Sequence, residues 1–256
     1  MGFSEGDAGF MIDGSRGYVS FQVTQPKADA QILHYIRKIL GFGSVSLQDA
    51  NNNTWQFRVR DRASLRKIVL IFNGNLILEK NYNRFRSFVT AFNLRYNENI
   101  EVLPRQHNVS LNDAWISGFT DAAGYFSVSV SDRMLKRKPY QVRVRFILAQ
   151  KDAEKELRTL SYRIDGRVSF QKSYGGHNLS VELTHLRGIL RYFRLFPLKT
   201  IKRVSLVKFL SVYSAVIKSI ADKRTFTPKE LEVLRRKMKQ INKIKNLDED
   251  KVRSTK

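Results

Sequence analysis

One stretch decides the fold of this sequence: Trp115-Ile-Ser-Gly-Phe-Thr-Asp-Ala-Ala-Gly-Tyr-Phe-Ser-Val-Ser129, in which an apolar segment with small residues passes directly into an alternating one. The chain opens on a shorter version of the same pattern, Gly2-Phe-Ser-Glu-Gly-Asp-Ala-Gly-Phe10. Because the pattern recurs half a chain later, the sequence predicts two similar units in a single polypeptide.

Three further blocks recur in the same order and at nearly constant spacing, as an internal duplication requires. The pairs are Phe21-Gln-Val-Thr-Gln25 with Phe146-Ile-Leu-Ala-Gln150, Gly43-Ser-Val-Ser-Leu-Gln48 with Gly166-Arg-Val-Ser-Phe-Gln171, and Leu70-Ile-Phe72 with Arg194-Leu-Phe196. The spacing increases after the first block, which predicts a longer strand hairpin in the second unit.

Each unit has the same predicted order of strands and helices. Residues 17–24 alternate and indicate a strand, whereas residues 28–40 have apolar side chains at helical spacing and stop at Gly41. The same criteria predict further strands over 45–47, 55–60, 125–130, 141–149, 168–171 and 179–183, and helices over 62–72, 81–92, 112–120 and 153–164. Ser110 or Asn112 is expected to cap the helix over 112–120.

These elements divide the chain into an N-terminal unit (1–101), a linker (102–111), a C-terminal unit (112–222) and a basic helical tail (223–256). The tail contains Thr227-Pro-Lys-Glu230, which is typical of a helix start because Pro stands at the first position and Glu at the third.

The composition points to a polyanionic partner. The 256 residues include 46 Lys and Arg against 23 Asp and Glu, a formal net charge of +23, and 42% are hydrophobic. A compact chain with that excess repels itself, so we expect it to bind nucleic acid rather than a membrane surface. No run of about 18 apolar residues is present. The sequence has no cysteine, which excludes disulfides and thiolate metal sites, and its four histidines are scattered.

Two predicted strands place Arg and Gln on one face. Alternation aligns one set within residues 55–60 and a second within 141–146: Gln56, Arg58 and Arg60, then Gln141, Arg143 and Arg145. Because Arg bridges guanine edges or phosphates and Gln pairs with adenine, these faces are candidate nucleic-acid surfaces, with ordinary solvated faces as the alternative. A basic hairpin tip is either a phosphate clamp or a solvated turn: Arg133, Lys136, Arg137 and Lys138.

The segment that begins at Trp115 closely resembles the second LAGLIDADG motif of single-chain homing endonucleases and group I intron maturases, and residues 2–8 resemble the end of the first motif. The resemblance extends to about residue 246. It implies an α+β fold in which two pseudo-symmetric αββαββα halves form a saddle of curved antiparallel sheets over a duplex. It also implies that the two motif helices pack side by side, with small residues such as Gly118 permitting close approach.

In this family the metal-binding acid is the eighth residue of the motif, which corresponds to Asp7 in the first motif and to Ala123 in the second. Because a methyl group cannot bind magnesium, Asp7 is the candidate catalytic and metal-binding acid. Glu5 and Asp121 stand two residues earlier and are expected to be structural. Only Met1 precedes Gly2, so the first motif helix is expected to be very short and its packing curtailed.

Four further polar residues match positions near the family's scissile phosphates. The resemblance implies that Lys80 and Lys202 are the active-site lysines, and that Gln25 and Gln150 lie at the ends of the central strands. They could hold a transition state or, in a protein that only binds, anchor phosphates. No cofactor is expected to be required for binding, and Mg²⁺ is expected only if nuclease activity is retained.

The first hypothesis is a LAGLIDADG protein that has lost nuclease activity and binds structured RNA, as an intron maturase or as a component of an organellar ribosome or other ribonucleoprotein. The missing carboxylate, the short first helix and the charge motivate it. The alternative is a site-specific homing endonuclease that cleaves or nicks double-stranded DNA with a divalent metal. A protein-binding module is the third class.

Expectations about partners and location follow mainly from the resemblance. We expect a monomer, because both halves are in one chain, with RNA favoured over double-stranded DNA, ribosomal or other ribonucleoprotein proteins as further partners, and no membrane. The family is common in organellar introns, which implies a mitochondrial or, alternatively, a chloroplast location for an organelle-encoded protein.

Overall fold

A computed structural model describes residues 1–14, 17–132 and 140–243 of the protein. The N-terminal half runs through eight elements and a short 3-10 turn at Lys27–Asp29: α1 (Gly2–Asp7), β1 (Ala8–Asp13), β2 (Tyr18–Pro26), α2 (Ala30–Leu40), β3 (Ser44–Asp49), β4 (Thr54–Val59), α3 (Arg62–Phe72) and α4 (Glu79–Tyr96). The helix over 62–72 has its predicted bounds, and the other predicted elements of this half differ by one to four residues at an end.

The C-terminal half repeats the order and adds one helix: α5 (Trp115–Ala123), β5 (Gly124–Asp132), β6 (Tyr140–Gln150), α6 (Glu154–Arg163), β7 (Arg167–Gln171), β8 (Gly176–Glu182), α7 (Leu186–Leu195), α8 (Lys202–Ala221) and α9 (Pro228–Gln240). The β5–β6 strands are longer than the β1–β2 strands, as the increased spacing in the second unit predicts.

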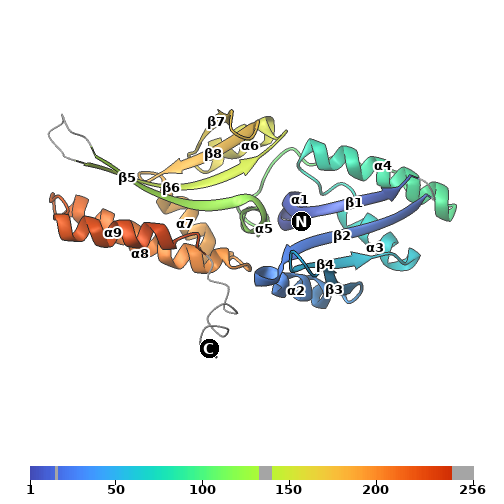
Figure 1. Ribbon diagram of the computed structural model, residues 1–256. Coiled ribbons are helices and arrows are strands. Elements are labelled where there is room, and N and C mark those ends of the chain that lie inside the picture. The colour runs from blue at the N-terminus through green and yellow to red at the C-terminus, as the bar shows by residue number, and fades with distance from the viewer. Residues whose placement is uncertain (15–16, 133–139, 244–256) are drawn as a thin grey trace, which may run out of the picture.

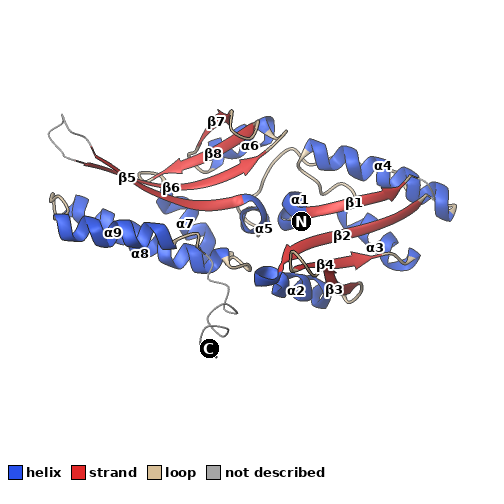
Figure 2. Ribbon diagram, viewed as in Figure 1, coloured by secondary structure: helices blue, strands red, loops and turns tan. Residues whose placement is uncertain are grey.

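Each half contains one four-stranded antiparallel sheet, in the strand orders β1-β2-β4-β3 and β5-β6-β8-β7. Figure 1 shows the two halves side by side, with α1 and α5 adjacent at the centre, and Figure 2 shows both sheets curving away from this junction. The predicted α+β architecture of two pseudo-symmetric halves is confirmed.

Each sheet buries one face under helices and leaves the other face open. The first core gathers Phe21, Phe57 and Phe72 from β2, β4 and α3, and the second gathers Phe126, Phe146 and Phe209 from β5, β6 and α8. Because strand residues alternate between faces, the residues between these phenylalanines lie on the opposite side. We call these two exposed sides the open faces.

The two motif helices approach so closely that glycine is required at their contact. A Cβ on Gly2 would lie 1.9 Å from the Trp115 carbonyl oxygen, and one on Gly118 would lie 2.7 Å from the Phe3 nitrogen. A Cβ on Gly6 would lie 2.3 Å from the Ala122 Cβ. The first helix has only six residues, as expected, but it contacts its partner along that length.

The predicted start of the second motif helix was wrong. The helix begins at Trp115 rather than residue 112, and neither Ser110 nor Asn112 caps it. Instead, the Asp113 carboxylate accepts a hydrogen bond from the Trp115 nitrogen at 2.8 Å. The apolar pattern placed the helix correctly, but three polar residues shortly before it, Ser110, Asn112 and Asp113, could each serve as a cap, and tertiary contacts select among them.

The last two helices pack together beneath β5 and β6 (Figure 1). Thr227 and Glu230 form the predicted capping box of α9, whose Leu234 is buried in the second core. By length and composition, α8 is the one helix in the described part of the chain that could cross a membrane. Core helices meet the same criterion, and α8 buries Phe209 and Val212 in the protein.

Candidate hydrolytic site and nucleic-acid interface

Asp7 ends α1 beside the end of β2. Its Oδ2 accepts a 2.7 Å hydrogen bond from Gln25 Nε2, and Gln25 is itself 8% exposed. Burial raises the pKa of Asp7, the Gln25 hydrogen bond and the nearby Lys202 lower it in part, and Asp29 raises it further. Among the described residues only Gln25 hydrogen bonds to this carboxylate, so the other oxygen is available to a ligand.

Lys202 begins α8 and reaches across to the end of α5. Its Nζ donates to the Thr120 carbonyl at 3.1 Å and to the Ala122 carbonyl at 2.8 Å. Burial lowers the pKa of Lys202, and the charges of Asp7, Asp121 and Asp29 oppose that change. Lys202 therefore lies in a partly desolvated position between the carbonyl end of the second motif helix and Asp7.

The equivalent position of the second half is arranged differently. Ala123 ends α5 as Asp7 ends α1, and Gln150 ends β6 as Gln25 lies near the end of β2. No described residue hydrogen bonds to the Gln150 side chain. Lys80, near the start of α4, forms a 2.7 Å ion pair with Asp152, which lowers the pKa of that exposed carboxyl. The carboxylate–glutamine pair of the first half thus has no counterpart here.

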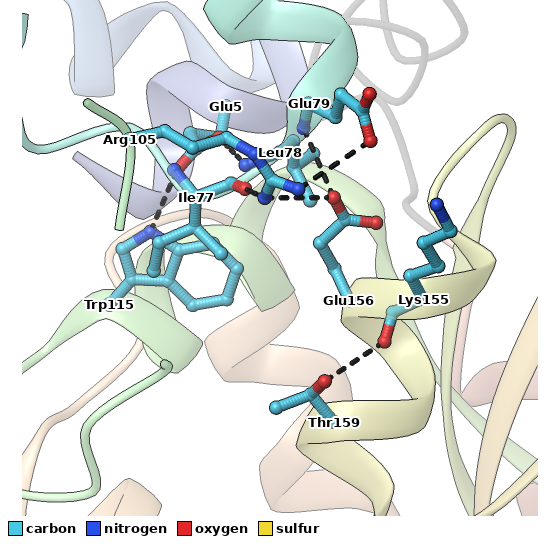
Figure 3. Close-up of polar contacts among 9 residues, drawn as sticks. All are labelled: Glu5, Ile77, Leu78, Glu79, Arg105, Trp115, Lys155, Glu156 and Thr159. Atoms are coloured by element: carbon cyan, nitrogen blue, oxygen red, sulfur yellow. Dashed lines mark hydrogen bonds and ion pairs between the residues drawn. The ribbon is translucent and has the colours of Figure 1, made fainter. Parts of the chain in front are cut away.

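The carboxylates of Glu5 and Asp121 accept hydrogen bonds from backbone N–H groups. The Glu5 carboxylate accepts the backbone N–H groups of Ile77 and Leu78 at 2.8 and 2.7 Å and the Trp115 indole N–H at 3.2 Å (Figure 3). Asp121 accepts the N–H groups of residues 199 and 200 and the Thr200 hydroxyl. The donors lie in equivalent segments, just before α4 for Glu5 and just before α8 for Asp121. These hydrogen bonds support the predicted structural role of both acids.

Each half also receives a carboxylate from the other half. Glu156 on α6 accepts the Glu79 backbone N–H at 3.1 Å, while Asp29 accepts the Ile201 backbone N–H at 2.8 Å. Arg105, between α4 and α5, donates to Glu156 at 3.1 Å and to the Ile77 carbonyl at 2.6 Å (Figure 3). The sequence does not predict these contacts, because no local pattern links residues so far apart.

The open face of the first half carries a polar cluster. Gln56, 5% exposed, donates to the Gln22 and Thr24 side chains, both at 3.2 Å. Beside it, Arg58 and Arg60 line a hollow of about 440 Å³. Burial lowers the pKa of Arg58, and the Arg60 charge adds to this effect. The alternation over residues 17–24 that predicts the strand could also have identified Gln22 and Thr24.

The open face of the second half carries the predicted arginines of β6. Arg143 is exposed and Arg145 half-buried, with Ser129 and Ser127 as their partners across β5. Gln141 lies on the same face, at the edge of the described residues. The Nε atoms of Arg58 and Arg145 are buried, and none of the described residues hydrogen bonds to them. The predicted clamp Arg133, Lys136, Arg137 and Lys138 lies outside the described residues.

The sequence of this chain matches a known protein family over both halves. The family model described as LAGLIDADG endonuclease matches residues 1–92 and 116–213, which covers both halves and both motif helices. The chain belongs to the LAGLIDADG family.

The names of two relatives refer to introns. A protein of Neurospora crassa called "Probable intron-encoded endonuclease 4" is 41% identical over 243 residues, which are 95% of this chain and 44% of the relative. The "Uncharacterized cox1 intron-2 37.2 kDa protein" of Schizosaccharomyces pombe is 24% identical over 79% of this chain and 63% of the relative. This LAGLIDADG chain therefore spans roughly half the length of these relatives.

Solved LAGLIDADG structures share the fold. The meganuclease I-AabMI bound to uncleaved DNA superposes with a TM-score of 0.76 at 22% identity, covering 94% of this chain and 97% of that one. I-SmaMI bound to uncleaveable DNA gives the same TM-score at 18% identity, over 94% and 96% of the two chains.

The two halves of this LAGLIDADG protein differ in their fit to a divalent metal. Asp7 offers a free carboxylate oxygen, which suits a hard cation that also takes phosphate oxygens and water. Within the described ranges, no three His, Cys, Asp or Glu side chains gather around one point. At Ala123 the chain supplies no carboxylate. Only the first half-site therefore fits a metal, which when bound would stabilise charge on a phosphoryl oxygen.

Proposed function

We propose that this LAGLIDADG protein binds structured RNA in preference to double-stranded DNA and does not cut both strands of a duplex. The observation that supports it most directly is Ala123, which stands where the other half has Asp7. Without a carboxylate there, Gln150 lacks its counterpart's partner and Lys80 is neutralised by Asp152. One half-site therefore lacks the carboxylate that could hold a cation against a phosphate.

In this proposal the open faces bind phosphates and bases, and the central polar residues anchor the backbone. Arg58, Arg143 and Arg145 have guanidinium groups on these faces, where charge-assisted hydrogen bonds to phosphate are favourable. Lys202 contributes positive charge close to the junction. The net charge of +23 favours a highly charged partner, and its contribution decreases steeply with added salt.

The preference for RNA and a mitochondrial location form the finer part of the proposal. Two relatives have intron names, one of them of a cox1 intron. A protein encoded in an intron meets that intron as RNA whenever the gene is expressed. We propose that it serves the intron RNA as a maturase or that it joins a ribonucleoprotein, with no metal required for binding.

Competition binding tests this proposal. Filter binding compares a folded group I intron transcript with a random-sequence duplex DNA of equal length across a salt series. We expect tighter binding to the RNA at every salt concentration and a steep decrease of both affinities as salt increases. Equal or tighter binding to the DNA would overturn the preference, and a salt-independent response would overturn nucleic-acid binding as a whole.

The second candidate function is a DNA nickase, and the Asp7–Gln25 pair beside Lys202 favours it. A single competent half-site would hydrolyse one strand only. Incubation of supercoiled plasmid carrying the cognate intron insertion site with Mg²⁺ or Mn²⁺ would then give nicked circles that Asp7→Asn abolishes. If supercoiled plasmid persists with the native chain, the nickase is excluded.

A further inference from the structure

One isoleucine on an open face is buried where the neighbouring arginines are not. Ile147 lies between Phe146 and Leu148, which point into the second core, so its own side chain lies on the open face. Ile147 is nevertheless only 3% exposed, and it does not belong to either core. The strand register places Tyr125 of β5 beside it, and Ser180 of β8 on its other side.

A second tyrosine lies on the same end of this face. The Tyr174 hydroxyl donates to Asn178 Oδ1 at 2.7 Å, and its ring lies against Gly176, where a Cβ would be 2.2 Å from the ring. Burial raises the pKa of Tyr174, and the charge of Tyr125 raises it further. Asn178 is in turn the register partner of Ala149, the next residue of β6 on this face.

The first half has glycine or polar residues at the positions that correspond to Tyr125, Ile147 and Ala149. There Gly9 pairs with Gln22 as Tyr125 pairs with Ile147, and Thr24 stands where the second half has Ala149. The apolar patch, which we define as the side chains of Tyr125, Ala149 and Tyr174 around the buried Ile147, therefore breaks the pseudo-symmetry of the open faces. It begins two residues after Ala123, so it adjoins the half-site that has lost its carboxylate.

We propose that the apolar patch receives the flat face of an unpaired nucleobase of the bound nucleic acid. A base stacked on tyrosine keeps its apolar face out of water whatever its identity, and such stacking recurs in the recognition of single strands and loops. The Asn178 amide N–H, whose oxygen is taken by Tyr174, can donate to the edge of that base. An unpaired base is favoured because it does not have to leave a duplex stack first.

This inference rests on the proposed binding of nucleic acid to the open faces. It adds a preference within that function: the end of the second open face selects a loop or bulge rather than continuous duplex. It does not need metal and does not involve Asp7, so it applies whether or not the first half-site can hydrolyse a phosphodiester.

Photocrosslinking tests the inference directly. Two hairpin RNAs of identical length carry 5-iodouridine, one in an all-uridine loop and the other in the paired stem. After irradiation, mass spectrometry identifies the crosslinked residue. We expect crosslinks from the loop probe to Tyr125 or Tyr174, and few from the stem probe. Crosslinks to these tyrosines with equal yield from both probes, or to other residues only, would overturn the stacking site.

Affinity measurements with matched variants supply a second readout. Tyr125→Ala should weaken binding of the loop probe by about tenfold and leave a loopless duplex probe unchanged, whereas Tyr125→Phe should retain the native preference. Tyr162→Ala removes a tyrosine that is 86% exposed on α6 and should change neither affinity. Equal loss on both probes would overturn the inference. If the native chain binds neither probe, the proposed function fails as well.

Discussion

At the scale of single residues, the carboxylates at the ends of the motif helices divide into two kinds. Burial raises the pKa of Glu5, but its carboxylate accepts two backbone N–H groups and an indole N–H, which lower that pKa in part. Asp7 accepts only the Gln25 amide, and burial raises its pKa. A buried acid whose ionised form destabilises the fold is typical of a site selected for binding rather than for stability.

Asp7→Asn should therefore stabilise the protein at neutral pH. A raised folded-state pKa contributes stability that is complete below the unfolded pKa and is lost as the pH rises through the folded pKa. The variant avoids that loss of stability. Its Tm should therefore exceed that of the native chain by a few degrees at pH 7.5, and the difference should vanish at about pH 4. Thermal melts at the two pH values measure this. A lower Tm for the variant at pH 7.5 would contradict the cost assigned to Asp7.

At the scale of elements, the contact of α1 with α5 depends on glycine. The Gly118 position lies against the backbone of Gly2 and Phe3 rather than against a side chain that could move aside. The resemblance to the LAGLIDADG family predicted this close approach, with Gly118 among the small residues that permit it. It could not predict which backbone atoms meet, because that depends on how each helix packs against the rest of its own half.

A pair of glycine substitutions separates this packing from helix propensity. Gly118→Ala should destabilise the protein by about 1–3 kcal/mol, because the added Cβ would lie 2.7 Å from the Phe3 nitrogen. Gly188→Ala in α7 meets nothing within 4 Å and should stabilise the protein by up to about 1 kcal/mol. Urea unfolding of both variants measures the difference. Similar effects of the two substitutions would show that the helix contact tolerates a larger residue.

At the scale of the whole molecule, the halves are joined by carboxylates that cross between them. Glu156 and Asp29 each accept a backbone N–H before a helix of the opposite half, and Arg105 orients Glu156 (Figure 3). These contacts therefore connect the two halves through residues that are remote in sequence.

Removal of the arginine should loosen this connection. Arg105→Gln leaves the buried Glu156 carboxylate without its cation and should cost about 1.5–3 kcal/mol of unfolding free energy. Arg158→Gln breaks an exposed pair with Glu154 and should change stability by less than about 1 kcal/mol. Urea titration checks both, and equal effects would contradict a linking role for Arg105.

Two arginine substitutions distinguish direct phosphate contacts from the general effect of surface charge. Arg143→Gln on the open face of β6 should reduce the slope of log affinity against log salt by about one, because one phosphate contact is lost. Arg158→Gln on α6 is the matched control and should leave the slope unchanged. An unchanged slope for Arg143→Gln would place the nucleic acid elsewhere on the molecule.

Sequence patterns predicted what is local or duplicated. The two units and the strand faces of Arg58 and Arg143 follow from internal comparison and alternation, and the departure at Ala123 follows from the resemblance to the family's motif. The cap of α5 did not, since Ser110, Asn112 and Asp113 are chemically similar. Nor did the Arg105–Glu156 contact or the apolar patch around Ile147, because burial of an isoleucine on an open face depends on side chains from other strands.

Strand-resolved cleavage of a duplex tests most directly whether the lost carboxylate governs activity. The two strands of the intron insertion site carry different fluorescent labels, and products are separated under denaturing conditions after incubation with Mn²⁺. For the native chain we predict no cleavage of the strand whose scissile phosphate lies beside Ala123. For Ala123→Asp we predict that the cleavage product of this strand appears. Cleavage of both strands by the native chain would contradict the assignment of Ala123 as a lost half-site.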